Sequence, residues 1–120
     1  MMIRLKRVYE APGAGDGYRV LVERLWPRGM VKERAKVDLW LRDAGASTEL
    51  RKWFGHDPAK WEEFRQKYFN ELAKKPEILR ELNEVIREKP TVSFLFAAHD
   101  REHNNAAALK EYIERTGESS

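Results

Sequence analysis

A continuous apolar segment constrains the fold of this chain more than any other feature. This segment, Thr91–Ala97, reads Thr-Val-Ser-Phe-Leu-Phe-Ala. A run of this length without regular polar alternation is typical of a strand that is buried on both faces, at the centre of a parallel sheet. We therefore expect Thr91–Ala97 to form the central strand, with helices on both sides of the sheet.

Other segments are predicted as further strands. Met2–Val8 places apolar side chains on one face, and Tyr18–Arg24 has an apolar centre that indicates burial on both faces. Val37–Leu41 is ambiguous, because its apolar residues fit both the alternation of a strand and the spacing of a helix. We favour a strand here, because Gly45 follows closely and would end a helix early.

Residues that typically begin or end helices occur between and after the predicted strands. Ser47 is a predicted N-cap and Gly55 a predicted C-terminal stop of one short helix. The starts of the later helices are predicted at Asp57–Pro58, Pro76 and Asp100. Helices between strands imply crossover connections. We therefore predict an α/β fold, a small, mostly parallel sheet flanked by helices in three layers, as a single domain over residues 1–120.

Composition narrows the class of protein. The chain has 120 residues, of which 42% are hydrophobic and 36% charged, and this balance is typical of a globular domain. The lack of cysteine excludes disulfides, thiolate nucleophiles and cysteine zinc sites. No apolar run approaches the roughly 20 residues that span a bilayer, and no signal-peptide core is present, so we expect a cytoplasmic protein without a membrane partner. The formal charge of +3 is only mildly basic, so partners must be inferred from local clusters.

Two arginines and a tryptophan follow the predicted second strand. Arg24 and Arg28 are permanent cations whose planar guanidinium groups can bind a carboxylate or a phosphate. Trp26 lies between them with a flat aromatic face, and Pro27 and Gly29 impose a turn. The arginines could equally pair with internal carboxylates or loop carbonyl groups, and the tryptophan could simply pack at the edge of the sheet.

Polar side chains also follow the predicted central strand. His99, Asp100, His103 and Asn104 fall near the start of the last helix, where free backbone N–H groups attract anions. Because ligands bind beyond the carboxyl ends of parallel strands, we expect this cluster and the arginines to face one cleft. The histidines also have the i, i+4 spacing of a metal pair, but no third ligand is nearby, and we predict no metal site. A simple capping role is the alternative for Asp100.

A third cluster lies at the junction of two predicted helices. His56 and Asp57 occupy this junction, a common place for a polar side chain to reach a cleft. His56 and His99 are candidates for proton transfer, because imidazole groups exchange protons near neutral pH. Asp100 and Asn104 would orient the ligand. The sequence contains neither a phosphate-binding glycine motif nor a serine nucleophile turn.

These segments together resemble the YeaO-like family, the short branch of a bacterial and archaeal group called domain of unknown function 488. The resemblance is carried by Tyr18–Val22, Arg24–Gly29, Asp38–Trp40, Ser47–Pro58 and Ala98–Asn104. It implies one site shared by the motif arginines, the His-Asp-Pro segment and the Asp-x-x-His-Asn segment, but no particular reaction. Longer relatives carry cysteines where this chain has Phe96 and Asn104, so thiol chemistry is excluded here.

The leading hypothesis is a cleft that binds a small anion, either a nucleotide or a phosphorylated metabolite, with hydrolysis or group transfer as its reaction if the protein is an enzyme. The predicted ligand-binding residues are Arg24, Trp26, Arg28, His103 and Asn104, and the predicted catalytic residues are His56, His99 and Asp100. A second hypothesis is a nucleic-acid-associated or regulatory binding module without catalysis, which would use Trp26 and the basic residues around it. A third is a structural role, which burial of both arginines in internal salt bridges would favour.

Overall fold

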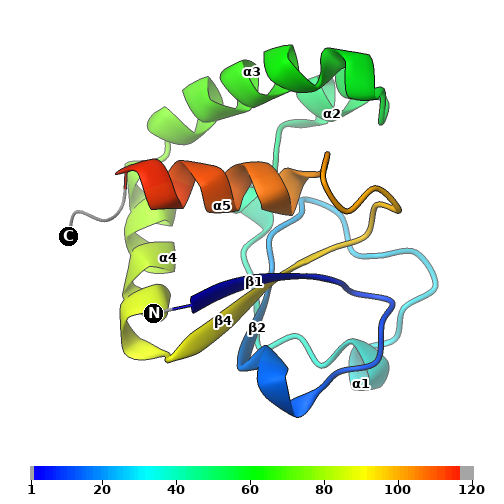
Figure 1. Ribbon diagram of the computed structural model, residues 1–120, viewed down its shortest axis with the longest axis vertical. Helices are drawn as coiled ribbons and strands as arrows, with labels where there is room; N and C mark the ends of the chain where they lie inside the picture. The colour runs from blue at the N-terminus through cyan, green and yellow to red at the C-terminus, as the bar shows by residue number, and fades with distance from the viewer. Residues whose placement is uncertain (1, 117–120) are drawn as a thin grey trace.

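A parallel sheet organises the molecule (Figure 1). The structure is a computed structural model that describes residues 2–116, and within them the sheet has four strands in the order β1–β4–β2–β3. Every strand pair is parallel, which confirms the predicted α/β class. The strands are β1 (Met2–Arg7), β2 (Tyr18–Leu21), β3 (Leu39–Trp40) and β4 (Thr91–Phe96).

β4 lies in the interior of the sheet, as its apolar sequence predicts. It pairs with β1 in a register that places Leu5 opposite Phe94, and with β2 in a register that places Val20 opposite Phe94. The side chains from Val92 to Phe96 are all buried. Burial on both faces therefore explains why this strand shows no polar alternation.

The two faces of the sheet are covered differently. Val20 and Phe94 face a large core that includes residues of α2, α3, α4 and α5. Leu21 and Leu95 point to the opposite face and pack with Met30 in a smaller core. Figure 1 shows α2, α3 and α5 above the strands and the short α1 below them. The helices are α1 (Lys32–Ala35), α2 (Thr48–Phe54), α3 (Trp61–Ala73), α4 (Pro76–Glu88) and α5 (Asn105–Thr116).

β2 is shorter than the predicted strand Tyr18–Arg24. It ends at Leu21, where its pairing with the 2-residue β3 also ends. Just beyond this point the indole N–H of Trp40 donates a hydrogen bond to the carbonyl group of Glu23 (2.7 Å). A Cβ atom at Gly45 would lie only 2.6 Å from the backbone of this segment. Residues 22–24 therefore contact the Trp40 side chain and the loop at Gly45 and form no further strand pairs.

Most of the predicted helix starts are confirmed. The hydroxyl group of Ser47 accepts a hydrogen bond from the backbone of Leu50 (3.1 Å) at the start of α2. Asp57 accepts one from the backbone of Ala59 (3.0 Å) at the 3₁₀ turn that precedes α3. Pro76 is the first residue of α4. These signals are local, so the sequence reveals them directly.

The predicted start of the last helix is wrong by several residues. α5 begins at Asn105, and its N-cap is Asn104, whose side-chain oxygen accepts a hydrogen bond from the backbone of Ala107 (2.8 Å). Asp100 instead accepts hydrogen bonds from backbone N–H groups of a turn that precedes the helix. Asp and Asn both form such turns and such caps, so residue type alone does not show which of them the helix follows.

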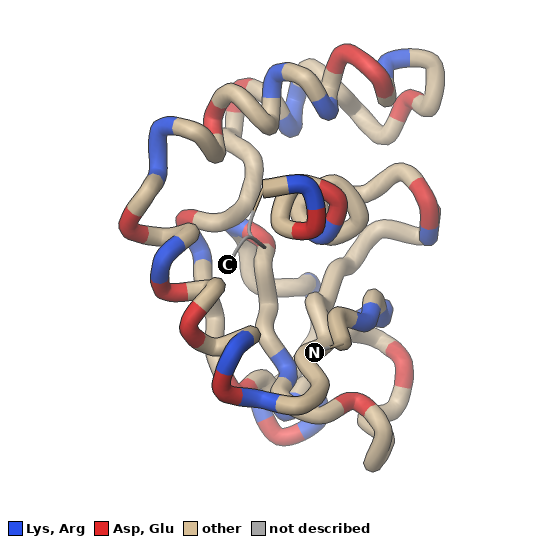
Figure 2. The backbone as a smooth tube through the Cα atoms, turned by 60° about the vertical axis from the view of Figure 1, so that its left-hand side comes forward, with Lys and Arg blue, Asp and Glu red and all other residues tan. Residues whose placement is uncertain are grey.

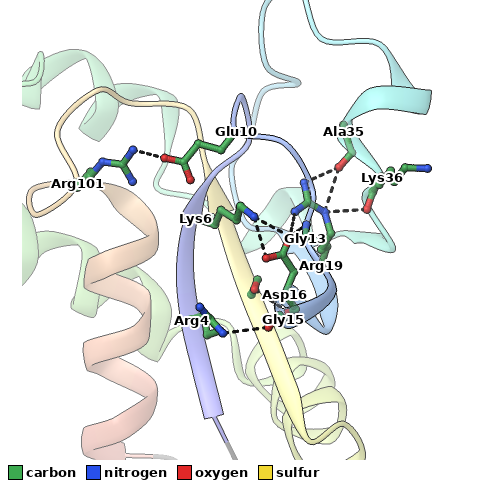
Figure 3. A network of polar contacts seen from close by, with 11 residues as sticks. Arg4, Lys6, Glu10, Gly13, Gly15, Asp16, Arg19, Ala35, Lys36 and Arg101 are labelled. Atoms are coloured by element: carbon green, nitrogen blue, oxygen red, sulfur yellow. Dashed lines mark hydrogen bonds and ion pairs between the residues drawn. The ribbon is translucent and has the colours of Figure 1, made fainter.

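A buried ionic network closes the second face of the sheet (Figure 3). Asp16 accepts hydrogen bonds from Lys6 (2.9 Å) and Arg19 (2.5 Å), and its carbonyl group accepts one from Ser93 (2.7 Å). Arg19 also donates to the carbonyl group of Ala35, at the end of α1 (2.7 Å). Burial opposes ionisation of Asp16, but hydrogen bonds from the loop backbone and Lys6 outweigh it and lower the pKa. The network fixes the β1–β2 connection against the sheet.

Lys and Arg residues alternate with Asp and Glu residues along the helices (Figure 2). Some of them form ion pairs one helical turn apart, such as Arg115 with Glu111 on α5 (2.8 Å) and Lys67 with Glu63 on α3 (3.7 Å). Exposed pairs of this kind contribute little to stability. None of the helices described in residues 2–116 is long and apolar enough to cross a membrane.

Candidate functional site

A cleft opens beyond the carboxyl ends of β1, β2 and β4. Its volume is about 1090 Å³, and it is lined mainly by the segment after β2, the C-terminal part of α2 and the segment after β4. Because the sheet is parallel, these strands all end at the same edge, and the loops that leave them face one another. Open α/β sheets ordinarily bind their ligands at this edge.

Every site residue predicted from the sequence lines this cleft. These residues are Arg24, Trp26, Arg28, His56, His99, Asp100, His103 and Asn104. They come from separate parts of the chain, which the parallel topology brings to one edge of the sheet. The side chains thus share a cleft, while their roles in binding and catalysis stay predictions.

Arg24 is held by the protein itself. Its guanidinium group donates hydrogen bonds to the carbonyl groups of Ala46 (3.1 Å) and Gly45 (3.1 Å). It also lies 3.5 Å from a carboxylate oxygen of Asp43. Loop carbonyl groups are one of the alternatives that the sequence leaves open for this arginine. Arg24 therefore shapes the wall of the cleft, with two of its five N–H donors bonded to loop carbonyl groups.

Trp26 is a packed residue at the edge of the cleft. Its indole N–H donates a hydrogen bond to the carbonyl group of Met30 (2.6 Å). Its ring meets Trp40 edge to face at a centroid distance of 5.4 Å, within the smaller core. These contacts correspond to the packing role that the sequence also allows for Trp26.

Other cations in the cleft lack such partners. Arg28, Arg51 and Lys52 line it, and within residues 2–116 their side chains make no hydrogen bond and no ion pair. The hydroxyl group of Tyr9 donates to the carbonyl group of Arg28 (2.8 Å) and so holds the backbone of this loop. The sequence does not single out Arg51 and Lys52, because charged residues on a helix ordinarily form a solvated face. Their donors are available to an anion in the cleft.

Asp100 and His103 form a hydrogen-bonded pair. Asp100 lies 2.9 Å from Nδ1 of His103 and also accepts hydrogen bonds from the backbone N–H groups of His103 and Glu102 (2.9 Å each). These backbone hydrogen bonds and the imidazole contact lower the pKa of Asp100 to about 2. The ring of His103 also meets Trp61 edge to face (5.2 Å between centroids). An ionised carboxylate that orients an imidazole is an arrangement suited to proton transfer or to anion binding.

Two adjacent asparagines line the cleft at the start of α5. Asn104 is buried, donates to the carbonyl group of Asp100 (2.9 Å) and caps α5. Asn105 donates to the carbonyl group of Val22 (2.9 Å) and accepts from the backbone of Ala46 (2.8 Å). Both side chains are thus engaged within the protein. Asn104, predicted to orient the ligand, orients the turn that carries Asp100 and His103.

His56 and His99 are exposed along the cleft. His56 follows Gly55, and both residues adopt left-handed backbone conformations (φ 59° and 56°). The ring of His56 lies 6.3 Å from that of Phe54, between centroids. Among residues 2–116, no group of three His, Asp or Glu side chains is arranged to hold a metal ion. Proton transfer by these two histidines stays a prediction.

Glu23 is a cleft residue that the sequence does not single out. It is half-buried, and one of its oxygens accepts a long hydrogen bond from the backbone of Ala97 (3.4 Å). Burial raises the pKa of Glu23 to about 7, although the Ala97 N–H and the charge of Arg51 oppose this change. The signal in the sequence is an acid directly after the apolar Val20–Val22, but beside Arg24 it resembles an internal ion-pair partner.

Comparison with known proteins identifies the family. The family model described as "Inactive DUF488-N3 subclade" matches residues 2–120. The uncharacterised protein YeaO of Escherichia coli (strain K12) is 36% identical over 113 residues, which cover 94% of this chain and 97% of YeaO. The uncharacterised protein Rv3073c of Mycobacterium tuberculosis (strain ATCC 25618 / H37Rv) is 44% identical over 70 residues, 58% of this chain and 59% of that protein.

No solved structure gives a significant match. The family match nevertheless extends from β1 through the end of the chain, and the similarity to YeaO covers nearly the full length of both proteins. Both findings confirm the predicted resemblance to YeaO-like proteins. The chain therefore belongs to the inactive DUF488-N3 subclade.

Proposed function

We propose that the cleft binds a small anionic ligand, a nucleotide or another phosphorylated metabolite. The observation that carries this proposal is the presence of Arg28, Arg51 and Lys52 on one cleft, without partners among residues 2–116. The guanidinium group of an arginine can bind two oxygens of one phosphate at once, and the ammonium group of a lysine adds a compact positive charge. Arg24, which is bonded to loop carbonyl groups, holds the wall on which Arg28 lies.

The remaining wall suits an organic molecule better than a bare ion. Phe54, Phe64, Ala97 and Ala98 line the same cleft and combine aromatic surface with small side chains. The volume of about 1090 Å³ is of the size that accommodates a ligand as large as a nucleotide. An apolar wall beside cations fits a molecule with a ring at one end and a phosphate at the other.

Binding without turnover is the form of this function that has the most support. The family model that matches the chain is described as inactive. Asp100, His56 and His99, predicted as catalytic, would then supply hydrogen bonds and charge to the ligand and its surroundings. Hydrolysis or group transfer is the alternative, and release of product from a bound phosphate compound during prolonged incubation would establish it.

A nucleic-acid-binding role has less support. It requires an accessible face of Trp26 together with Arg24 and Arg28, but Trp26 packs against Trp40 and Arg24 is bonded to loop carbonyl groups. Salt-sensitive binding of single-stranded oligonucleotides, with several basic residues contributing, would favour this alternative.

Calorimetric titration with inorganic phosphate and nucleoside monophosphates tests the proposal. Arg28→Ala should weaken binding by about tenfold or more and leave the fold intact, because its side chain makes no hydrogen bond within residues 2–116. Arg51→Ala should act in the same direction. Arg80→Ala, at an exposed position on α4, is the matched control and should bind like the wild type. Equal affinity in wild type, Arg28→Ala and Arg51→Ala, or no binding of any probe, would contradict the proposal.

A further inference from the structure

The segment after β2 holds an acidic side chain, Glu23, on the wall of the cleft. Its backbone is fixed, because Trp40 donates a hydrogen bond to its carbonyl group (2.7 Å). The chain at Gly45 also passes so close that a Cβ atom there would lie 3.1 Å from the Cα atom of Glu23. These contacts from β3 and from the loop before α2 hold Glu23 at the cleft.

Glu23 has fewer partners than a desolvated carboxyl group can use. Within residues 2–116 its side chain accepts one hydrogen bond, from the backbone of Ala97 at 3.4 Å, and forms no ion pair. Arg51 acts on it only through charge at longer range. A carboxylate accepts up to about four hydrogen bonds, and leaving a partly buried acceptor unpaired costs stability. A group of this kind on a cleft wall is typical of a functional position.

Charged and titratable groups surround Glu23 on several sides. Arg24 follows it in the chain, Arg51 belongs to α2 and Tyr68 to α3. Asp100, on the segment after β4, lines the same cleft. The hydroxyl group of Tyr68 donates to the carbonyl group at position 44, so it is not a partner for the carboxylate. Burial raises the pKa of Glu23 to about 7, so at neutral pH it is charged in only part of the molecules.

We infer that Glu23 determines which anions the cleft accepts, because it accepts a hydrogen bond from an N–H or O–H group of the ligand while the cations bind its phosphate. The ligand class is then a phosphate ester with hydrogen-bond donors on its organic part, such as a sugar phosphate or a nucleoside monophosphate. This inference rests on the proposed function. A carboxylate in the cleft repels bare phosphate. Glu23 therefore favours phosphate esters that carry a hydrogen-bond donor and disfavours inorganic phosphate.

Two variants isolate this role. Glu23→Gln removes the charge with little change of shape, and Glu23→Met removes both the charge and the acceptor at a similar volume. Glu84→Gln, at an exposed position on α4, is the control for the loss of one negative charge. Calorimetric titration at about pH 8, where Glu23 is charged, measures the affinity for inorganic phosphate, ribose 5-phosphate and nucleoside monophosphates. Circular dichroism checks that each variant is folded.

The expected result is a loss of affinity for the organic phosphate without a loss for inorganic phosphate. In Glu23→Met, the organic phosphate that the wild type binds most tightly should lose about tenfold or more in affinity. Inorganic phosphate should bind as tightly as in the wild type, or more tightly. Glu23→Gln should weaken binding of the organic phosphate by a smaller factor, because it keeps one acceptor oxygen. It should affect inorganic phosphate as Glu23→Met does, because both variants remove the charge. A purely structural role would weaken both kinds of probe alike.

Equal changes for both probes, or an unchanged affinity for organic phosphates, would overturn the inference. In that case Arg28-dependent binding of phosphate would leave the proposed function standing. If the wild type binds no phosphate compound, both the proposed function and the role of Glu23 are rejected.

Discussion

At the scale of single residues, Glu23 couples the stability of the fold to pH, because its carboxyl group is desolvated only in the folded chain. Burial raises the pKa of Glu23 from 4.5 to about 7. Between these values the folded state holds a proton that the unfolded state releases, so stability falls as the pH rises through this window. Above about pH 7 the whole penalty is present, and it amounts to at most about 3 kcal/mol.

Glu23→Gln removes this penalty and should therefore stabilise the protein at alkaline pH. We expect its melting temperature to exceed that of the wild type by several degrees at about pH 8 and to differ much less at about pH 5. Differential scanning calorimetry at both pH values measures the effect, with Glu84→Gln as the control for a lost charge. A variant that melts below the wild type at the higher pH would contradict the desolvated state of Glu23.

Asp100, the other acid in the cleft, behaves in the opposite way. Hydrogen bonds from the backbone of His103 and Glu102 lower the pKa of Asp100 to about 2, so it stays charged throughout the neutral range. Its stabilising contribution is lost only as the pH falls from about 4 towards 2. One acid of the cleft is thus permanently charged and orients His103, while the other responds to pH near neutrality and faces the ligand space.

At the scale of elements, the β1–β2 connection depends on a close approach between a loop and a strand. Gly17 has a φ of 66°, and a Cβ atom there would lie 2.3 Å from the carbonyl oxygen of Thr91. The absence of a side chain lets this loop reach β4, where Asp16 accepts the hydrogen bond from Ser93. The buried ionic network on this face therefore requires glycine at position 17.

Gly17→Ala should destabilise the fold by roughly 3 kcal/mol or more, because the methyl group overlaps the backbone of β4 and the left-handed conformation becomes strained. Gly29→Ala is a matched control: its φ is 75°, but apart from its chain neighbours no atom lies within 4 Å of the added Cβ. The free energy of unfolding of Gly29→Ala should fall by only about 1 kcal/mol. Urea denaturation measures both losses, and similar values for the two variants would contradict a steric role for Gly17.

The sequence predicts those elements whose signals are local. The apolar Thr91–Ala97, the N-cap Ser47 and the helix start at Pro76 each depend on a few adjacent residues, and the structure confirms them. Features set by distant segments were not predictable in this way. The early end of β2 coincides with the end of its pairing with the 2-residue β3, and the hydrogen bonds of Arg24 depend on carbonyl groups of a loop 21 residues away.

The same distinction applies to the candidate site. A strand followed by polar residues marks the edge where a parallel sheet binds ligands, so the predicted side chains do share one cleft. Which of them are free is a property of tertiary contacts. Arg24 and Arg28 look alike in sequence, but the first is bonded to Gly45 and Ala46 while the second has no such partner within residues 2–116. Glu23 gains its raised pKa from burial that no local pattern reveals.

At the scale of the whole molecule, the sheet is shared by two cores and should couple them into one cooperative unit. β2 contributes Val20 to the large core and Leu21 to the small one. Asn105 adds a link between the end of β2, the loop before α2 and the start of α5. Because the two cores share these strands, loss of one core should disturb the other, and we predict a single unfolding transition.

The tryptophans allow this prediction to be tested on each side of the sheet. Trp26 and Trp40 pack in the small core, whereas Trp53 and Trp61 pack against the large one. In Trp53→Phe/Trp61→Phe the fluorescence reports the small core, and in Trp26→Phe/Trp40→Phe it reports the large one. Within each variant, the urea midpoint from fluorescence should coincide with the midpoint from far-ultraviolet circular dichroism, which follows the helices. Separate midpoints within one variant would show that the two cores unfold independently, because the shared strands then fail to transmit the loss of one face to the other.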